Sequence, residues 1–458
     1  RQPEGPPRLI ELIPGAATEV CLYGVAIDIG TTTVSVYLVD LLTGEVVDSA
    51  AEYNGQIRRG EDVISRIIYA GKNNGLGELG ALVRETINEV LNRLVQRNHV
   101  DPLQIYKATV AGNTTMMHLF IGLPPTSIRL TPYIPAVNHP LPLLAAEVGL
   151  GIHPLAAVDC LPGVASYVGA DITAGVLASG LANAEELTLF IDVGTNGEMV
   201  LGTREWLVTC ACSAGPAFEG AGVVCGMRAT RGAIEEVWIN GQTYEPTYRV
   251  IGGARPKGIC GSGLISLVAE LFITGVVDKG GKFGVGAGLA SAPARAGASP
   301  APTPRLREGE HGSEYVIAWA SETDSGRDIV ITKVDIDNLM RAKAAIYAGF
   351  TVLAQSVGVD LADVQRLLIG GAFGKYINVE KAVQIGLLPD MPWDRFNFLG
   401  NTSVMGAYAA LLSRQARAQV KAIARKMTYI ELSADNTFYD AFTSALFLPH
   451  TDMSRFPT

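Results

Sequence analysis

Cysteine and histidine are both scarce in this sequence. The 458 residues contain six of each. So few cysteines in so long a chain exclude a disulfide-rich secreted scaffold, and we expect reduced thiols in a cytoplasmic protein. The histidines show no metal-ligand spacing, and His118, which follows two methionines in an apolar stretch, is expected to lie in the core. The cysteines are Cys21, Cys160, Cys210, Cys212, Cys225 and Cys260.

The last four cysteines are numerous enough to hold a metal cluster. However, a Cys-x-Cys pair (Cys210 and Cys212) followed by long, unequal gaps to Cys225 and Cys260 is a poor metal signature. Free cysteine is among the most buried residue types, so these four are interpreted as small core residues.

The sequence also lacks a long hydrophobic run and a positive net charge. No run approaches the ~18–20 apolar residues that a membrane helix needs. The net charge is −9 and the isoelectric point about 5.3, which argues against binding to nucleic acid or to an anionic membrane. Because 48% of the residues are hydrophobic and the chain has 458 residues, we expect a folded protein of two or three lobes.

One short pattern occurs twice. Ala26-Ile27-Asp28-Ile29-Gly30-Thr31 reappears as Phe190-Ile191-Asp192-Val193-Gly194-Thr195. Each copy is an apolar strand that ends in Asp, Gly and Thr and leads into a second strand. The repetition predicts two halves of similar topology.

The first copy has the residue types of a phosphate-binding turn. Gly30 allows a tight turn and a close approach to a phosphate. The N–H groups and hydroxyls of Thr31, Thr32 and Thr33 can donate to phosphate oxygens. Asp28 is a hard oxygen ligand suited to Mg²⁺, either directly or through its waters.

In the second copy, Gly194, Thr195 and Asn196 can hold the other side of a triphosphate. Asp192 can hold the metal ion or orient an attacking water. Phosphoryl transfer mostly needs such positioning and charge stabilisation, so Asp28 and Asp192 are the predicted catalytic residues. A single copy would also fit an ordinary β-hairpin whose Asp is satisfied locally, but two copies make that interpretation much weaker.

A glycine-rich turn follows a later strand. Leu367-Leu368-Ile369 leads into Gly370-Gly371-Ala372-Phe373-Gly374. Gly370, Gly371, Phe373 and Gly374 are predicted to lie against the base or ribose of a nucleotide. A plain strand-to-helix turn is the alternative.

Further polar residues in glycine-flanked turns are second-tier nucleotide ligands. They are Asn113, Thr114, Glu219 and Ser262. Turn capping is the alternative role, because Asn and Ser favour turns for local hydrogen bonding.

These three motifs resemble those of the superfamily of sugar kinases, heat-shock chaperones and actin. Gly169–Gly175 and Gly400–Ala407 resemble the two helices that connect the lobes of that superfamily. Their small residues, Ser403 among them, suit close helix packing at a hinge, and packing alone is the alternative explanation. The resemblance implies an α/β protein with two actin-like, ribonuclease-H-like lobes and a nucleotide cleft between them. It also implies ATP and Mg²⁺ as ligands.

Longer segments resemble a narrower family, the reductive activators of corrinoid proteins. The segments are Cys212–Gly222, Gly226–Ala229, Gly258–Leu264 and Ala111–His118, and the resemblance runs from about Gly24 to the C-terminus. It implies an ATPase that drives reduction of cob(II)amide to cob(I)amide on a partner corrinoid protein, either a corrinoid/iron–sulfur protein or a methyltransferase corrinoid protein. In that family an N-terminal plant-type 2Fe–2S domain supplies the electron. The C-x₄-C-x₂-C spacing of such a domain is absent from this chain, so we expect it in a missing N-terminal part.

The expected domain division follows from these motifs. Residues 1–22 are a linker remnant, 23–184 are lobe I, and 185–402 are lobe II with a mobile Gly/Ala/Pro-rich loop at 280–312. Residues 403–458 are a connecting helix and a tail that packs back on lobe I. A homodimer is expected as the commonest oligomer.

Two other functions fit the same fold. A small-molecule kinase would place a substrate hydroxyl beside Asp192, with a pocket from the proline-rich residues 123–165. A nucleotide-switched scaffold would assemble with ATP and need no useful catalysis.

Overall fold

The structure, a computed structural model, describes most of the chain. The described residues are 10, 20–194, 196–220, 222–284, 305–310, 312–371, 377–434 and 436–457. The predicted linker remnant and most of the predicted loop at 280–312 lie outside them. The chain divides into two compact units. The first comprises Arg1–Phe190, Val200–Cys210 and Asn401–Ile430, and the second comprises Ile191–Met199, Ala211–Gly400 and Glu431–Thr458.

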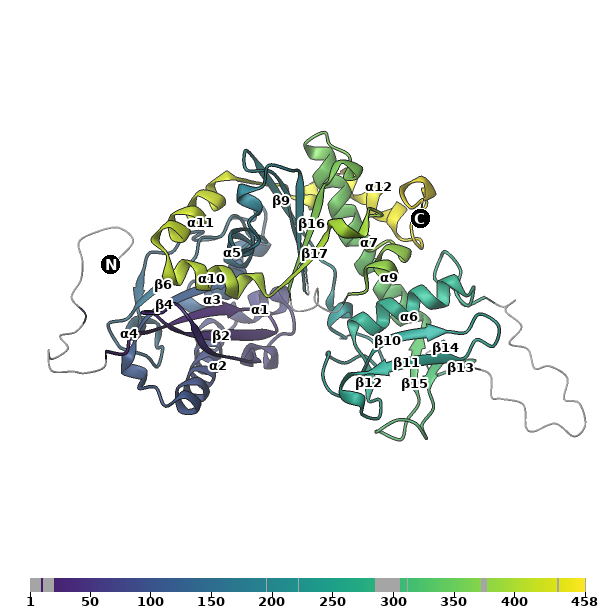
Figure 1. Cartoon of the computed structure of the whole chain (residues 1–458), viewed down its shortest axis with the longest axis horizontal. Helices are drawn as coiled ribbons and strands as arrows, with labels where there is room; N and C mark the ends of the chain where they lie inside the picture. The colour runs from purple at the N-terminus through teal and green to yellow at the C-terminus, as the bar shows by residue number, and fades with distance from the viewer. Residues whose placement is uncertain are drawn as a thin grey trace, which may run out of the picture. The chain divides into compact units, whose positions relative to one another are not determined.

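A six-stranded sheet with the order β3-β2-β1-β4-β6-β5 lies in the first unit (Figure 1). The apolar run of β1 occupies a central position, antiparallel to β2 and parallel to β4, and from Gly24 onward it is fully buried. Burial on both faces explains why β1 has no polar alternation before its Asp. The strands are β1 Tyr23–Ile29, β2 Thr33–Asp40, β3 Val46–Tyr53, β4 Ile105–Gly112, β5 Leu143–Leu144 and β6 Ala157–Cys160.

The helices of this unit cover the sheet with apolar faces. α2 buries Leu79, Val83, Ile87, Val90 and Leu94, a helical spacing that turns one apolar face of the helix toward the core. The helices are α1 Val63–Ala70, α2 Gly75–Asn98, α3 Thr114–Ile121, α4 Ala145–Val148, α5 Ala170–Ser179, α10 Thr402–Leu412 and α11 Arg414–Lys426.

α5 and α10 are the helices predicted from small residues, and they pack closely on one another. A Cβ at Gly406 would lie 2.1 Å from the carbonyl oxygen of Ala174, so the backbones touch where Gly406 stands. The small residues therefore have a packing role here, as one of the two interpretations held.

The second six-stranded sheet has the order β17-β16-β7-β8-β9-β18. Both copies of the repeat form a strand, a turn and a neighbouring strand, β1–β2 and β7–β8, as predicted. The strands are β7 Thr188–Val193, β8 Gly197–Gly202, β9 Leu207–Cys212, β16 Arg366–Gly370, β17 Phe396–Gly400 and β18 Met427–Tyr429.

Among the described residues, two three-stranded sheets and four further α-helices belong to the second unit (Figure 1). One sheet has the order β11-β10-β12 and the other β13-β14-β15. Their strands are β10 Ala233–Ile239, β11 Pro246–Val250, β12 Gly258–Ile259, β13 Leu306–Gly309, β14 Gly312–Ala318 and β15 Ile329–Thr332. The helices are α6 Gly261–Ile273, α7 Lys333–Ser356, α9 Val379–Gln384 and α12 Asn436–Ala445.

The C-terminal tail corrects part of the predicted domain division. Residues up to Ile430 group with the first unit, but Glu431–Thr458 groups with the second, where α12 packs on α7. The expectation that the whole segment 403–458 packs on lobe I is therefore wrong for its last part. The reason is that α12 packs on α7 of the second unit; in α12 the side chain of Ala445 is buried and those of Phe438 and Phe442 are half-buried.

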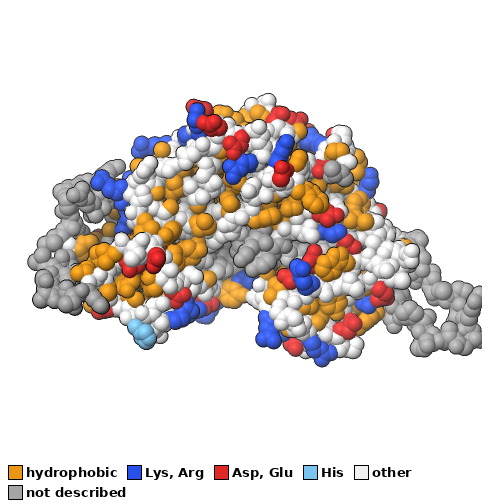
Figure 2. All heavy atoms as spheres, viewed as in Figure 1, with side chains coloured by type: hydrophobic (Ala, Val, Ile, Leu, Met, Phe, Trp, Pro, Cys, Tyr) orange, Lys and Arg blue, Asp and Glu red, His pale blue; other side chains and the backbone are white. Residues whose placement is uncertain are grey.

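Two further observations concern the surface charges and the helices. On the face seen in Figure 2, Lys and Arg side chains are interspersed with Asp and Glu over the described residues. Within the ranges that the structure describes, no helix is both long and apolar enough to cross a membrane.

A lysine lies fully buried in the middle of α7. The Nζ of Lys343 donates to the carbonyl oxygens of Phe447 and Pro449, the latter at 2.7 Å. Burial lowers the pKa of Lys343 to about 7. Above that pH the folded state releases a proton that the unfolded state keeps up to about pH 10.4, so the contribution of Lys343 to stability rises with pH across this window.

We expect Lys343→Met to remove this pH dependence. Between pH 7 and 8.5, the free energy of unfolding of the wild type should rise relative to that of K343M by up to ~1.4 kcal/mol per pH unit. Urea unfolding of both proteins at several pH values measures the difference. A constant difference across this range would show that Lys343 keeps its proton in the folded state.

Candidate functional site

Asp28 stands near the end of β1, with both carboxylate oxygens engaged. Oδ1 accepts from Ser403 Oγ at 2.7 Å, and Oδ2 accepts from Asn401 Nδ2 at 2.9 Å. Burial raises the pKa of Asp28, and the two hydrogen bonds partly oppose that rise. Asn401 also caps α10, because its Oδ1 accepts from Val404 N. The carboxylate thus lies at a helix N-terminus, where the helix dipole favours negative charge.

The first predicted turn is a tight one that requires glycine. Gly30 N donates to Thr33 O at 3.0 Å, and a Cβ on Gly30 would lie 2.6 Å from that oxygen. Thr31 Oγ1 accepts from Asn113 Nδ2 at 2.9 Å. Asn113 also caps α3, because its Oδ1 accepts from Met116 N. Asn113 therefore caps a helix and contacts the first turn at the same time. The structure therefore brings together Gly30, Thr31 and Asn113.

Two residues that the sequence did not single out support this turn. Arg66, fully buried in α1, donates from Nη2 to Thr31 O at 2.6 Å and from Nε to Gly60 O at 2.8 Å. Asn54 donates from Nδ2 to Gly30 O at 2.9 Å. Arg66 is the one charged residue in the otherwise largely apolar sequence of α1, and this could have drawn attention to it. An arginine is rarely buried unless its guanidinium has hydrogen-bond acceptors.

The second predicted turn lies beside the glycine-rich turn. Gly194 N donates to Asn196 O at 2.9 Å. Gly371 has a φ of +86°, and a Cβ there would lie 2.7 Å from both Asp192 Oδ1 and Val193 O. Asp192 and Gly371 are thus neighbours, as the nucleotide interpretation requires. Thr195, Phe373 and Gly374 lie outside the described residues.

We expect Gly371→Ala to disrupt this contact. The matched control is Gly326→Ala, because Gly326 has a similar positive φ of +66° but open space around it. Both variants share the backbone strain of an alanine at positive φ, whereas only G371A adds the clash with Asp192. G371A should weaken ATP binding by about tenfold or more, which corresponds to ~1.4 kcal/mol, and G326A should not. Calorimetric titration with MgATP measures both, and equal affinities would contradict the placement of the nucleotide at Gly371.

A cavity of about 360 Å³ lies in the second unit, within the size range of small-molecule sites. The segment that leaves β9 forms one wall, and Cys212, the last residue of β9, contacts the start of β8 through Sγ and Gly197 O at 3.3 Å. The cavity therefore adjoins the edge of the sheet where the second turn lies. Its lining residues are Ser213, Ala214, Gly215, Ala217, Gly222, Asn338, Arg341 and Phe442.

The opposite wall of the cavity carries a cation and an amide. Arg341 Nη2 donates to Asn338 Oδ1 at 2.6 Å, and Asn338 Nδ2 donates to Gly222 O at 2.8 Å. The guanidinium of Arg341 is thus oriented by a neutral amide, which does not neutralise its charge. A guanidinium of this kind suits an anionic or planar ligand. Neither residue was predicted, because only the fold brings α7 to the segment at 213–222.

The three remaining second-tier candidates have different surroundings. Ser262 lies in the first turn of α6, with its Oγ 3.3 Å from Cys260 Sγ. This contact joins Ser262 to a neighbouring side chain and not to a backbone group of the turn, and the nucleotide role of Ser262 stays a prediction. The side chain of Glu219 lies outside the described residues. Thr114 follows Asn113 in the sequence, and its Oγ1 donates to Ala165 O at 2.7 Å.

The donor sets limit what could hold a metal ion. Among the described residues, no group of three or more His, Cys, Asp or Glu side chains is arranged to hold one. Asp28 is a single, nearly buried carboxylate whose oxygens already accept hydrogen bonds. This fits Mg²⁺, which is usually held by one or two carboxylates, several waters and substrate phosphates.

Comparisons with known proteins agree along the whole chain. Residues 186–458 match the family described as the C-terminal domain of RACo, the ASKHA domain, and residues 23–184 match the RACo middle region. The chain is 37% identical over 438 residues to corrinoid activation enzyme RamQ of Eubacterium limosum, covering 95% of this chain and 72% of that one. It is 26% identical to the [Co(II) methylated amine-specific corrinoid protein] reductase of Methanosarcina barkeri, covering 93% and 77%.

A solved structure is similar over nearly the whole chain. It is a reductive activator for corrinoid, iron–sulfur protein, with a TM-score of 0.87 and 51% sequence identity, and the match covers 97% of this chain and 68% of that one. The α/β fold with actin-like halves, expected from the sequence, is confirmed by these matches.

Proposed function

Because this chain belongs to the RACo family of reductive activators, we propose that it activates a corrinoid protein by coupling ATP binding and hydrolysis to the reduction of cob(II)amide to cob(I)amide. The observation that carries the proposal is the similarity over 97% of the chain to a reductive activator for corrinoid, iron–sulfur protein. The names of the two curated relatives, a corrinoid activation enzyme and a corrinoid protein reductase, support the same reaction.

The two Asp residues have distinct proposed roles. Asp28, held by Asn401 and Ser403, would bind Mg²⁺ through water, since its oxygens keep lone pairs beyond the two hydrogen bonds. Asp192 would orient the attacking water or share the metal ion. Bound MgATP supplies a phosphoryl group that water can accept, and positioning by the protein accelerates that transfer.

Backbone and small side chains would hold the phosphates and the nucleoside. Gly30, Thr31, Thr32, Thr33 and Asn113 are proposed ligands from the first unit. Proposed ligands from the second unit are Gly194, Thr195, Asn196, Glu219, Ser262, Gly370, Gly371, Phe373 and Gly374. Support for this set comes from the tight turn at Gly30, the contact of Gly371 with Asp192, and the adjoining cavity with Arg341.

The electron would come from a 2Fe–2S centre outside this chain, because the chain carries no C-x₄-C-x₂-C spacing. For a one-electron step, every ~59 mV of unfavourable potential reduces the cob(I)amide to cob(II)amide ratio tenfold. ATP can offset this only if the ATP-bound protein binds the partner differently from the ATP-free protein.

The proposal also covers the lobes of the chain, its location in the cell, its oligomeric state and its partner. We infer lobe I at 23–184, which is the range of one family match, and lobe II at 185–402, which lies almost wholly within the other match at 186–458. A cytoplasmic location and a homodimer are part of the proposal. The partner is a corrinoid/iron–sulfur protein or a methyltransferase corrinoid protein.

The test is ATP hydrolysis with Mg²⁺ by the purified chain, alone and with a cob(II)amide-loaded corrinoid protein. The same corrinoid protein without its corrinoid is the control. We expect the loaded partner to increase the rate of phosphate release, and the apo partner to have a smaller effect. ATP turnover that is indifferent to both would contradict the coupling, and phosphorylation of a sugar or acid in a substrate screen would favour a kinase.

A further inference from the structure

A second cavity, of about 470 Å³, lies within the second unit. Its volume is within the ~300–1,000 Å³ that is usual for small-molecule sites. Its walls come from the C-terminal end of α6, from α9, and from two short 3₁₀-helices, Trp393–Arg395 and Met453–Arg455. None of the lining residues is among those predicted to bind a nucleotide, so the proposed function leaves this cavity without a role.

Most of the lining is apolar, and part of it is in contact with water. Trp393 and Ile273 line the cavity and are 63% and 54% exposed, respectively. Val383 and Phe456 also line it and are almost fully buried. A ligand with an apolar body would therefore remove exposed apolar surface from water when it enters, which is the main driving force for binding at such a site.

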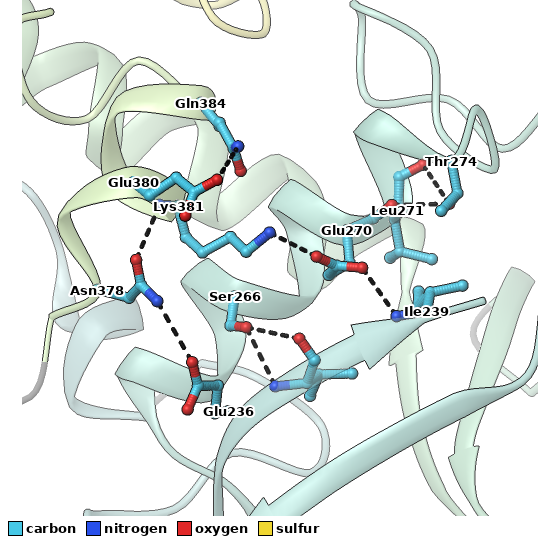
Figure 3. Close-up of polar contacts among 11 residues, drawn as sticks. Glu236, Ile239, Ser266, Glu270, Leu271, Thr274, Asn378, Glu380, Lys381 and Gln384 are labelled. Atoms are coloured by element: carbon cyan, nitrogen blue, oxygen red, sulfur yellow. Dashed lines mark hydrogen bonds and ion pairs between the residues drawn. The ribbon is translucent and has the colours of Figure 1, made fainter. Parts of the chain in front are cut away.

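Glu380 is the one charged side chain among the described residues that line the cavity. It is exposed on α9, and its Oε1 accepts from Gln384 Nε2, one turn further on, at 3.2 Å (Figure 3). Because Gln384 is neutral, this hydrogen bond orients the carboxylate without compensating its charge. Within the part of the chain that the structure describes, Glu380 forms no ion pair.

The lysine next to Glu380 in sequence is used elsewhere. Lys381 extends toward α6, where its Nζ lies 2.5 Å from Glu270 Oε1 (Figure 3). The other oxygen of Glu270 accepts from Ile239 N of β10 at 2.8 Å. The ion pair is nearly buried, so moving Lys381 to Glu380 would leave Glu270 buried without compensation.

The arginines of the two 3₁₀-helices also have other partners. Arg395 Nη1 donates to Val364 O at 2.9 Å. Arg455 Nε lies 3.6 Å from Asp452 Oδ2. Neither arginine therefore neutralises Glu380, and the cavity contains an accessible carboxylate whose negative charge is available to a ligand.

The walls formed by α9 and α6 are held in place by hydrogen bonds to β10. Asn378 caps α9, because its Oδ1 accepts from Lys381 N at 3.2 Å, and its Nδ2 donates to Glu236 Oε1 of β10 at 3.3 Å (Figure 3). Ser266 Oγ of α6 accepts from Val237 N at 3.1 Å and donates to Val237 O at 2.8 Å. A site that is formed before its ligand arrives loses less conformational entropy on binding.

The chemistry of the lining favours a positively charged ligand. Aromatic faces attract cations, tryptophan most strongly, and a carboxylate attracts them as well. A neutral ligand would remove water from Glu380 without replacing it, and an anion would be repelled. We propose that this cavity binds a small organic cation, with its positive nitrogen beside Glu380 and its apolar body against Trp393 and Val383. The proposal does not depend on the proposed ATP function.

The test uses three probes that share a phenylethyl body and differ in charge. They are 2-phenylethylammonium, 2-phenylethanol and 3-phenylpropanoate, each titrated into the full chain without nucleotide at neutral pH and low salt. Ligand-observed NMR gives the dissociation constants. We expect the ammonium to bind about five- to tenfold more tightly than the alcohol, and the carboxylate to bind more weakly than the alcohol. Added salt should reduce the preference for the ammonium.

Two variants locate the binding in this cavity. Glu380→Gln keeps the shape of the side chain and removes its charge, so the preference for the ammonium over the alcohol should fall to less than about twofold. Glu89→Gln, at an exposed position of α2 in the first unit, is the matched control and should leave the preference unchanged. Trp393→Leu should weaken the binding of both probes at least about threefold, since an aromatic wall is lost.

Thermal unfolding shows whether the variants are folded, and both changes are at exposed positions, where substitutions have small effects on stability. Equal affinities of the wild type for the ammonium and the alcohol would overturn the proposal. A preference for the ammonium that persists in E380Q, or binding that is unchanged in W393L, would overturn it as well, because the cation would then bind outside this cavity.

Discussion

Replacing Asp28 by Asn is expected to abolish most ATP turnover without unfolding the protein. An Asn at this position can accept from Asn401 Nδ2 and donate to Ser403 Oγ, so the local hydrogen bonds are retained. The negative charge that would hold Mg²⁺ is lost. We expect kcat for ATP hydrolysis to fall by about 10²–10³-fold, the range seen when one stabilising group of a transition state is removed.

The stability of this variant supplies an independent check. Because burial raises the pKa of Asp28 in the folded state, ionisation of Asp28 opposes folding. As the pH rises from the usual Asp pKa through the raised one, the wild type should lose stability relative to D28N. Urea unfolding across that range and phosphate release at neutral pH measure the two effects. Asp101→Asn, at an exposed capping position, is the control. Unchanged turnover in D28N would remove Asp28 from the site.

Replacing Arg66 by Met is expected to destabilise the first turn and the unit that contains it. The side chain is fully buried, and it donates to Thr31 O, Gly60 O and Gln56 Oε1. Met fills much of the space but satisfies none of these acceptors. Buried polar groups that lose a partner cost ~1–3 kcal/mol each, so we expect a loss of about 3 kcal/mol or more in the free energy of unfolding.

The control for R66M is Arg59→Met. Arg59 is exposed and pairs with Glu78 at the surface, so R59M should change the free energy of unfolding by no more than about 0.5 kcal/mol. Chemical unfolding of both variants gives the comparison. R66M should also weaken MgATP binding, since Thr31 loses its support. Equal stability of R66M and R59M would show that the three acceptors find other partners.

The elements of the site that have local signals were predictable from the sequence. An apolar strand followed by Asp, Gly and Thr specifies a strand and a tight turn within a few residues, and both copies form as expected. The helical spacing of α2 and the small residues of α10 are also local patterns, and α10 forms where the connecting helix was expected.

The partners of these residues were not predictable, because they are distant in the chain. Asn401 and Ser403 reach Asp28 across more than 370 residues of sequence. Ser403 was noted only as a small residue of a connecting helix. Its hydroxyl has a partner only once α10 packs on β1.

The packing of the tail shows the same limit. The aromatic residues Phe438 and Phe442 of α12 indicate an apolar face, but the pattern does not say which surface covers it. The tail was expected on lobe I, whereas α12 packs on α7 and brings Phe442 to the cavity beside Arg341. The spacing of apolar residues along a helix predicts which face is buried, but it does not identify the element that covers this face.

Reduction of the corrinoid itself tests whether this chain couples ATP to the formation of cob(I)amide. A cob(II)amide-loaded corrinoid protein is held with excess titanium(III) citrate, which can donate one electron to each cobalt, and cob(I)amide is followed by visible absorption. The chain is then added with MgATP, with MgADP, or without nucleotide, and D28N is run in parallel. We predict that cob(I)amide increases only with the wild-type chain and MgATP. An equal yield with and without the chain and ATP would contradict it.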